Sequence, residues 1–126
     1  MEIIEINITT QEQNEFIDIT GIINKEIARL SISKGICYLF VPHTTAALTI
    51  NENADPTVQV DIMNHLNKLI PYKNNYLHAE GNSAAHIKAS LFGSNNIVFI
   101  KDNKLLLGTW QGIYFCEFDG PRKRKL

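Results

Sequence analysis

The sequence predicts one α+β domain, built on a largely antiparallel β-sheet or sandwich with two to three helices. Short runs rich in β-branched and aromatic residues cluster toward both ends of the chain, and such runs are typical of strands. Segments with helical periodicity lie between them, and predicted strands outnumber predicted helices, which favours the α+β class. The 126 residues suffice for one hydrophobic core, so we expect a single domain over residues 1–126.

The first third of the chain predicts two strands, a helix and a buried strand. Residues 2–10 alternate apolar and polar side chains, which is the period of a half-buried strand. A short second strand is expected over 16–19. Ile23, Ile27 and Leu30 recur at helical spacing, with Thr20 as the expected N-cap. The aromatic and β-branched run 36–41 then predicts a buried strand.

The middle of the chain predicts a strand, a longer helix and a loop. Residues 46–50 are the expected strand. Asp55 and Pro56 form a helix start, with a carboxylate N-cap before a proline at the first helical position. One apolar stripe follows, made by Val58, Ile62, Leu66, Leu69 and Ile70. Pro71 ends the helix, and 72–83 has turn residues and no periodicity, as in a functional loop.

The last third predicts a short helix followed by strands. The helix is expected over 84–91, capped by Asn82 or Ser83 and stopped by Gly93. The runs 97–100 and 104–107 predict a hairpin that turns at 102–103. A last strand is expected over 110–118.

Charge and cysteine content limit the classes of partner and compartment. Twelve basic and thirteen acidic residues give a net charge of -1, which favours neither nucleic acid nor an anionic membrane as a partner. The basic run 122–125 is interpreted as a solvated or edge-strand terminus, with a nucleic-acid arm as the less favoured alternative. Cys37 and Cys116 lie in apolar runs and are expected as buried free thiols. No signal peptide and no run of roughly 20 apolar residues is present, so we expect a cytoplasmic protein.

Three of the four histidines are candidates for a shared site. His43, His78 and His86 each lie at a loop or a helix start, where scaffolds present functional groups, and neutral imidazole is a common metal ligand. Their spacing matches no metal motif, so unrelated surface or capping roles stay an alternative. His65 falls within the amphipathic helix and is interpreted as a partly exposed helix residue.

Three carboxylates are candidate metal ligands beside His43. Glu52, Asp55 and Asp61 follow it in the chain, although Asp55 is equally well explained as an N-cap. Magnesium would prefer these carboxylates, and zinc would prefer the imidazoles. A divalent metal is therefore expected, with its identity open between magnesium and zinc.

Two segments are candidates for phosphate or substrate binding. Residues 80–83 lead into a helix N-terminus, where Asn82, Ser83 and the nearby Lys88 could hold a phosphate group. Two glycines flank a tryptophan over 108–112. That segment predicts either a bulge with the tryptophan packed in the core or a close backbone approach to a ligand that Gln111 would bind.

Three segments in this order resemble the YjbQ-like family of secondary thiamine-phosphate synthases. They read HTTAALTINENADP (43–56), HAEGNSAAHIK (78–88) and GTWQGI (108–113). Each motif alone is modest, but all three in order are specific, and the resemblance extends over nearly the whole chain. It strengthens the prediction of one shared histidine site.

The resemblance implies a YjbQ-like fold that assembles as a homotrimer, with His43, His78 and His86 together as catalytic or metal-binding residues. It also implies that Glu52, Asp55 and Asp61 lie near the histidines. The implied activity joins hydroxymethylpyrimidine diphosphate to a thiazole phosphate and releases pyrophosphate. The expected partner is therefore a small phosphorylated metabolite. Its phosphate would be held by Lys88, Arg122 and the start of the helix over 84–91.

Two other functions remain open at this level. Three imidazoles around zinc would generate a hydroxide nucleophile, which is the chemistry of a zinc-dependent hydrolase. A non-catalytic protein that binds a metal or a phosphometabolite is the second alternative. A serine-type hydrolase is disfavoured because no nucleophile elbow accompanies Thr44, Thr45 or Ser83.

Overall fold

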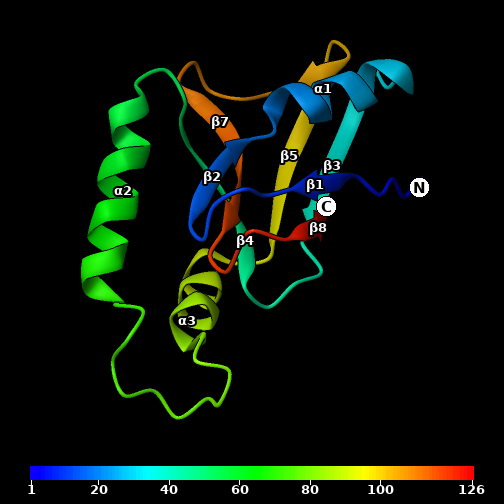
Figure 1. Ribbon diagram of the computed structural model, residues 1–126. Helices are drawn as coiled ribbons and strands as arrows, with labels where there is room; N and C mark the ends of the chain where they lie inside the picture. The colour runs from blue at the N-terminus through cyan, green and yellow to red at the C-terminus, as the bar shows by residue number, and fades with distance from the viewer.

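The computed structural model describes every residue from 1 to 126 and contains three helices and eight strands. The helices are α1 (Thr20–Arg29), α2 (Pro56–Leu69) and α3 (Ser83–Phe92). The strands are β1 (Asn7–Thr9), β2 (Glu15–Asp18), β3 (Lys34–Phe40), β4 (Ala46–Glu52), β5 (Asn95–Lys101), β6 (Lys104–Leu105), β7 (Gln111–Glu117) and β8 (Lys123–Lys125). All strand pairs are antiparallel. The predicted α+β class is confirmed (Figure 1).

The sheet β2-β7-β4 forms the middle layer, because both of its faces are covered. On one face Leu48 and Phe115 belong to a core cluster shared with α1 and β3-β5. On the other face Ala47 and Cys116 belong to a second cluster that includes residues of α2 and α3. Figure 1 shows α2 and α3 on one side of this sheet and β3, β5 and α1 on the other. Successive residues of β4 and β7 therefore enter different cores, as the period of two requires.

The second sheet, β3-β5-β6, buries one face and exposes the other. Its hairpin turns at Asp102 and Asn103, as predicted, and both have positive φ, 51° and 63°, as a two-residue type I′ turn requires. Cys37 and Val98 are opposite each other and face the core. The outward face carries exposed apolar side chains, namely Ile36, Tyr38, Phe40, Ile97 and Phe99.

The two ends of the chain pair with each other as β1 and β8 (Figure 1). The basic run 122–125 does include an edge strand, in line with the favoured interpretation. Arg124, opposite Ile8 in this pair, nevertheless turns inward and is buried. Of the two favoured interpretations, the edge strand is therefore the one found, and a solvated position does not hold for Arg124.

Several local predictions need correction. The predicted strand over 2–10 is a strand only over Asn7–Thr9, although the predicted alternation of burial extends further. Thr20 does not cap α1; its Oγ1 accepts a hydrogen bond from the Ile113 N–H at 2.8 Å. Leu69, predicted in the apolar stripe, is 64% exposed, and Trp110 is 63% exposed, which rules out the alternative in which it packs in the core.

Other local predictions are confirmed. Asp55 is the N-cap of α2, and its Oδ1 accepts from the Thr57 N–H at 2.9 Å. Both cysteines are free thiols and Cys116 is buried, as predicted, whereas Cys37 is only half-buried. None of the three helices combines the length and the apolarity needed to cross a bilayer.

Candidate functional site

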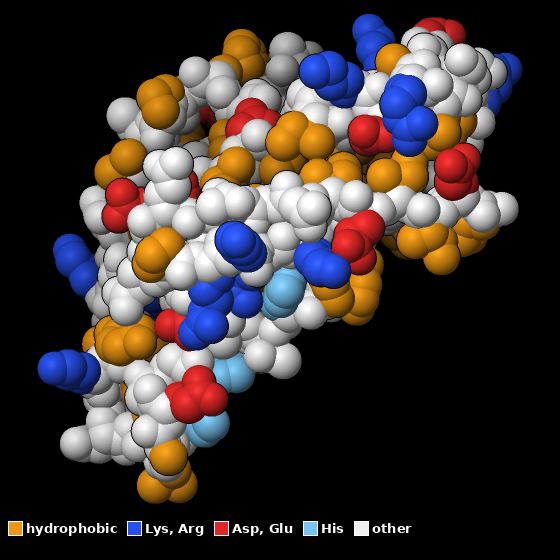
Figure 2. Space-filling view, turned by 45° about the vertical axis from the view of Figure 1, so that its right-hand side comes forward, with side chains coloured by type: hydrophobic (Ala, Val, Ile, Leu, Met, Phe, Trp, Pro, Cys, Tyr) orange, Lys and Arg blue, Asp and Glu red, His pale blue; other side chains and the backbone are white.

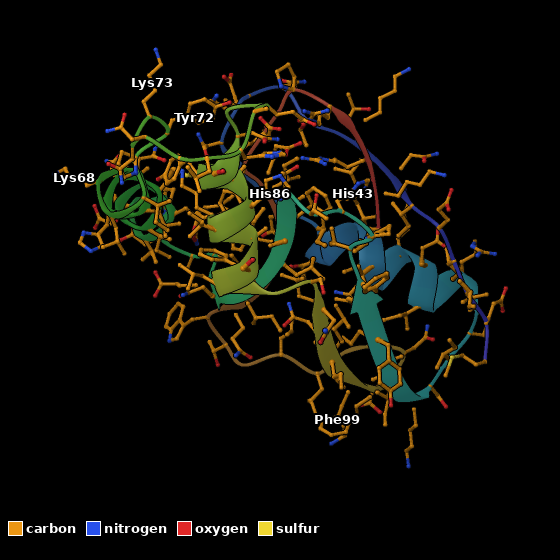
Figure 3. All side chains as sticks on the ribbon, turned by 90° about the horizontal axis from the view of Figure 1, so that it is seen from below. His43, Lys68, Tyr72, Lys73, His86 and Phe99 are labelled. Atoms are coloured by element: carbon orange, nitrogen blue, oxygen red, sulfur yellow. The ribbon has the colours of Figure 1, made fainter.

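The three histidines from separate parts of the chain line one polar cavity of about 510 Å³. Figure 3 shows His43 and His86 on neighbouring segments at the same end of the molecule. The other lining residues are Pro42, Thr44, Thr45, His78, Glu80, Asn82, Asp119, Arg122 and Arg124. No large apolar side chain is among them. We call this hollow the polar cavity.

His43 lies in the connection between β3 and β4, and its ring is fixed by the C-terminal strand. The backbone N–H of Lys125 donates to His43 Nε2 at 2.9 Å. A neutral imidazole that accepts at Nε2 carries its proton on Nδ1. Burial, reinforced by the positive charge of Arg124, lowers the pKa of His43 below its ordinary value. His43 is therefore a neutral ring near pH 7, with a donor at Nδ1.

A buried ion pair forms the floor of the polar cavity. Arg124 Nε donates to Glu117 Oε1 at 2.8 Å, and Arg124 Nη2 donates to Thr45 Oγ1 at 2.8 Å. Thr10 Oγ1 donates to the same Glu117 oxygen at 2.7 Å. Burial acts to raise the pKa of Glu117, but these hydrogen bonds and the guanidinium outweigh it and lower the pKa. Glu117 is thus ionised and holds Arg124 in one orientation.

The start of α3 supplies the opposite wall. Gly81 has φ 76°, in the left-handed region that glycine adopts without strain, and the chain then enters the helix at Asn82. Asn82 is buried, and its Nδ2 donates to Asp119 Oδ2 at 2.9 Å. The same Asp119 oxygen accepts from Arg122 Nη2 at 2.9 Å. This chain of hydrogen bonds ties the start of α3 to the segment that leads into β8.

His78 and His86 face each other beside this wall. Their ring centroids are 5.4 Å apart and their planes are at 85°, an edge-to-face arrangement. His86 lies on α3, one turn after Asn82, and His78 lies in the preceding loop. Figure 2 shows histidine side chains at the surface beside a group of Lys and Arg side chains. The predicted convergence of the three histidines is therefore present within one chain.

Three of the five predicted phosphate or substrate ligands lie elsewhere. Ser83 lines a neighbouring hollow rather than the polar cavity. Lys88 is buried, and its Nζ donates to Asn67 Oδ1 at 2.7 Å and to Asn14 Oδ1 at 3.2 Å. Gln111 accepts from the Gly108 N–H at 2.8 Å, which closes a turn at the far end of β7. Asn82 and Arg122 are the two that do line the polar cavity.

The predicted carboxylates are not with the histidines. β4 begins at Ala46 beside the polar cavity and ends at Glu52, and six steps of roughly 3.3 Å put Glu52 roughly 20 Å away. Asp55 is exposed at the start of α2, and Asp61 is exposed further along that helix. Within one chain, the expectation that Glu52, Asp55 and Asp61 lie near the histidines is wrong, since none of them lines the polar cavity. Their proximity in sequence did not reveal that β4 carries the chain away from His43.

The side chains of one chain do not fit a resident metal ion. No three His, Cys, Asp or Glu side chains are placed to hold one cation. His43 is also unsuited, because coordination through one ring nitrogen puts the proton on the other. If His43 coordinated a metal through Nδ1, its Nε2 would carry a proton that points at the Lys125 N–H donor. If it coordinated through Nε2, the metal would displace the hydrogen bond from the Lys125 N–H. We therefore derive no chemical step through a metal.

The sequence interpretation missed the most buried part of the site. The basic run predicts only a solvated or edge-strand terminus at Arg124, and the run 110–118 predicts only a strand at Glu117. The signal for Glu117 was its position as a lone acid in the run Tyr114–Phe118, since a buried carboxylate requires a partner. Nothing in the sequence indicated Asp119 as the residue that links Asn82 to Arg122.

The fold and the polar cavity define a class of small α+β protein whose candidate site lies between the β3–β4 loop, the start of α3 and the C-terminal strand. A sequence model described as "UPF0047 protein YjbQ-like" matches residues 4–126, so the chain belongs to the YjbQ-like (UPF0047) family. The UPF0047 protein MJ1081 of Methanocaldococcus jannaschii is 55% identical over 94% of this chain and 86% of its own length. The UPF0047 protein YugU of Bacillus subtilis is 45% identical over 94% of this chain and 91% of its own length.

Solved structures support the same assignment. An uncharacterized conserved protein of this family from Clostridium acetobutylicum is 54% identical, with a TM-score of 0.94 over 98% of this chain and 95% of that one. A protein of unknown function from Sulfolobus solfataricus (SSO2532) is 32% identical, with a TM-score of 0.90 over 96% and 89% of the two chains. The family fold predicted from the sequence motifs is therefore confirmed.

Proposed function

We propose that the polar cavity binds a small phosphorylated metabolite and carries a thiamine-phosphate synthase-type reaction. The observation that supports this proposal is that three imidazoles and two guanidinium groups line one cavity without a large apolar side chain. Arginine is well matched to phosphate because its planar donors can bind two oxygens at once. The activity itself is the one that the family motifs imply.

The reaction needs hydrogen-bond donors for the departing pyrophosphate more than it needs a nucleophile on the protein. Joining hydroxymethylpyrimidine diphosphate to a thiazole phosphate breaks a carbon–oxygen bond, and negative charge builds on the departing pyrophosphate. Arg122, at the rim, donates to Asp119 through Nε and Nη2 and would meet that charge through Nη1, and the Nδ1 proton of His43 would add a second donor. The positive end of α3 at Asn82 adds to the attraction.

The remaining groups act through orientation and proton supply. Arg124 is held by Glu117 and Thr45, so its guanidinium is ordered before a ligand binds, with Glu117 compensating its charge. We assign to His78 and His86 the supply of a proton to the pyrophosphate oxygen as the bond breaks, because both line the cavity. They form a pair at the boundary of the cavity, so each is expected to matter for turnover.

The test is a synthase assay on the purified protein with both substrates and detection of thiamine phosphate. We expect His43→Ala and His86→Ala to abolish product formation and to leave the circular dichroism spectrum unchanged. His65→Ala is the matched control, since His65 is exposed on α2 outside the cavity. Unchanged turnover in both cavity variants would reject the proposal. Phosphate-ester binding without turnover in the wild type would assign a non-catalytic phosphometabolite-binding function instead.

We also propose a homotrimer, as the family motifs imply. The outward face of β3 and β5 supports it, because Tyr38, Phe40 and Phe99 are each about 60% exposed there, and a contiguous apolar patch on a soluble domain is typical of an interface. Figure 3 shows Phe99 on the side of the molecule away from His86. Analytical ultracentrifugation should give three times the chain mass for the wild type and a smaller mass for Tyr38→Lys combined with Phe99→Lys.

A cytoplasmic location is the last part of this proposal. Free thiols at Cys37 and Cys116 are typical of a reducing compartment. Fractionation of the native cells with detection of the untagged protein tests it.

A further inference from the structure

The carboxylate of Asp119 lines the polar cavity and is held in one orientation. Its side chain is only 11% exposed. Oδ2 accepts from Asn82 Nδ2 and from Arg122 Nη2, both at 2.9 Å, and the backbone N–H of Asp119 donates to Glu117 Oε2 at 3.1 Å. The position of this carboxylate is therefore fixed before a ligand binds.

The second oxygen of the same carboxylate is left for a ligand. Asp119 Oδ1 accepts no hydrogen bond within the chain, and it is not buried. A carboxylate oxygen can accept a hydrogen bond but cannot donate one. Oδ1 is thus an ordered acceptor at the polar cavity, and it favours a ligand group that donates.

Two neighbouring residues make this side of the polar cavity rich in acceptors. Glu80 also lines the cavity, and its Oε2 accepts from Asn82 Nδ2 at 3.3 Å. Because both partners of the Asn82 amide are carboxylates, its nitrogen must face them. The Asn82 oxygen, Oδ1, is buried and accepts no hydrogen bond. A ligand that brings only acceptors to this wall would therefore find no partner for them there.

The presence of a proton on an oxyanion decides how it fits such a cavity. Sulfate carries no proton near neutral pH, so all its oxygens are acceptors, and a carboxylate repels it. Phosphate keeps at least one O–H under the same conditions. That O–H can donate to a carboxylate, and a hydrogen bond to a charged acceptor is among the strong ones. The remaining oxygens can accept from His43 Nδ1 and Arg122.

We propose that Asp119 is a specificity-determining residue, which admits a phosphate group that carries a proton and rejects an oxyanion that carries none. The protonated oxygen of the ligand donates to Asp119 Oδ1. A site built to pair with a ligand O–H rejects the analogue that lacks it, because the acceptor is then left unpaired. This inference rests on the proposed phosphate-binding function and adds the protonation state of the bound group and the residue that recognises it.

The experiment compares inorganic phosphate with sulfate by isothermal titration calorimetry on the full chain. At mildly alkaline pH most of the phosphate is the doubly charged ion with one O–H, so the two ions match in charge and shape. A hydrogen bond to a charged group corresponds to roughly tenfold to hundredfold in affinity. We therefore expect the wild type to bind phosphate at least about tenfold more tightly than sulfate.

The decisive variant is Asp119→Asn, which keeps the shape of the side chain. The amide oxygen can still accept from Asn82 and Arg122, while the amide nitrogen takes the place of Oδ1 and donates. Phosphate should bind this variant less tightly and sulfate more tightly, so the affinity ratio should fall to about one or below. Circular dichroism confirms that the variant is folded.

Two matched variants make the same chemical change at other carboxylates. Glu80→Gln alters the other acidic residue of the polar cavity, which is exposed to solvent. Asp102→Asn alters an exposed residue in the turn between β5 and β6, outside the cavity. Both should keep the wild-type preference for phosphate.

Each result bears on one of the two proposals. If the wild type binds the two ions equally well, this inference is overturned while phosphate binding stands, and that comparison needs no variant. If the preference persists in a folded Asp119→Asn, or is lost in Glu80→Gln instead, Asp119 does not recognise the proton and the inference is again overturned. If neither ion binds, the proposed phosphate-binding function fails and this inference fails with it.

Discussion

Arg124 and Glu117 form an ion pair inside the protein, with Nε and Oε1 2.8 Å apart and exposed side-chain fractions of 5% and 0%. The pair sits under the polar cavity and connects β8 to the end of β7. Removing one partner of such a pair leaves the other charge buried and unpaired. The loss in the free energy of unfolding comes more from that unpaired buried charge than from the lost attraction.

The first prediction concerns this pair. Arg124→Ala should lower the free energy of unfolding by about 3–5 kcal/mol because Glu117 loses its counter-charge, as measured by urea denaturation. Arg29→Ala is the matched control. Its exposed pair with Glu26 at 2.8 Å should be worth about 0–1 kcal/mol. Equal costs for the two variants would show that the Arg124–Glu117 pair is not buried in solution.

The second prediction concerns pH and His43. Its pKa is lowered in the folded protein relative to the ordinary value of 6.5, so the unfolded chain binds the proton more readily than the folded one. The free energy of unfolding should therefore fall as the pH is lowered through the range just below 6.5. His43→Gln should reduce this slope. The lowered pKa of Glu117 acts separately, because its contribution is lost only as the pH falls below its ordinary value of 4.5.

The third prediction separates Lys88 from Arg122, which the sequence placed together as phosphate ligands. Lys88→Met should leave the affinity for phenyl phosphate unchanged, since Lys88 Nζ is bound to Asn67 and Asn14 away from the polar cavity. Arg122→Gln should weaken it by about tenfold through loss of a charged donor. Calorimetric titration of both variants gives the comparison. A large loss of affinity in Lys88→Met would show that Lys88 does contribute to phosphate binding.

The fourth prediction concerns metal removal. Phosphate-ester binding should survive dialysis against a chelator, because no three ligand side chains of one chain are placed to hold a cation. Elemental analysis of untagged protein before and after dialysis is the measurement. Stoichiometric zinc or magnesium that disappears in His78→Ala and His86→Ala would contradict this expectation. It would also indicate a site completed by ligands from another copy.

The fifth prediction concerns the glycine that precedes the rim of the polar cavity. A Cβ on Gly120 would lie 2.2 Å from the Glu12 carbonyl oxygen, so Gly120→Ala must shift backbone and should cost about 1–3 kcal/mol of stability. Gly21 in α1 has nothing within 4 Å of such a Cβ. Gly21→Ala should therefore stabilise the protein by about 0.5–1 kcal/mol. Thermal unfolding of the two variants should shift in opposite directions.

Much of the local structure could be predicted from the sequence because short-range rules control it. The N-cap at Asp55, the end of α2 near Pro71 and the turn at Asp102 and Asn103 each depend on neighbouring residues alone. Thr20 was misjudged for the opposite reason. Its hydroxyl bonds to the backbone of Ile113, 93 positions away in the chain, and no local rule reports that contact.

The histidine site likewise combines features that the sequence predicts with features that only the tertiary structure shows. Sequence alone placed His43, His78 and His86 each at a loop or a helix start, and the family motifs implied that they share one site. Only the tertiary structure showed that Arg124 is a buried member of the site, because that depends on the pairing of β8 with β1. The direction of β4 likewise decided that Glu52 lies far from His43. Local conformation follows from neighbours in the chain, whereas the membership of a site depends on strand pairing and on which charges can find a buried partner.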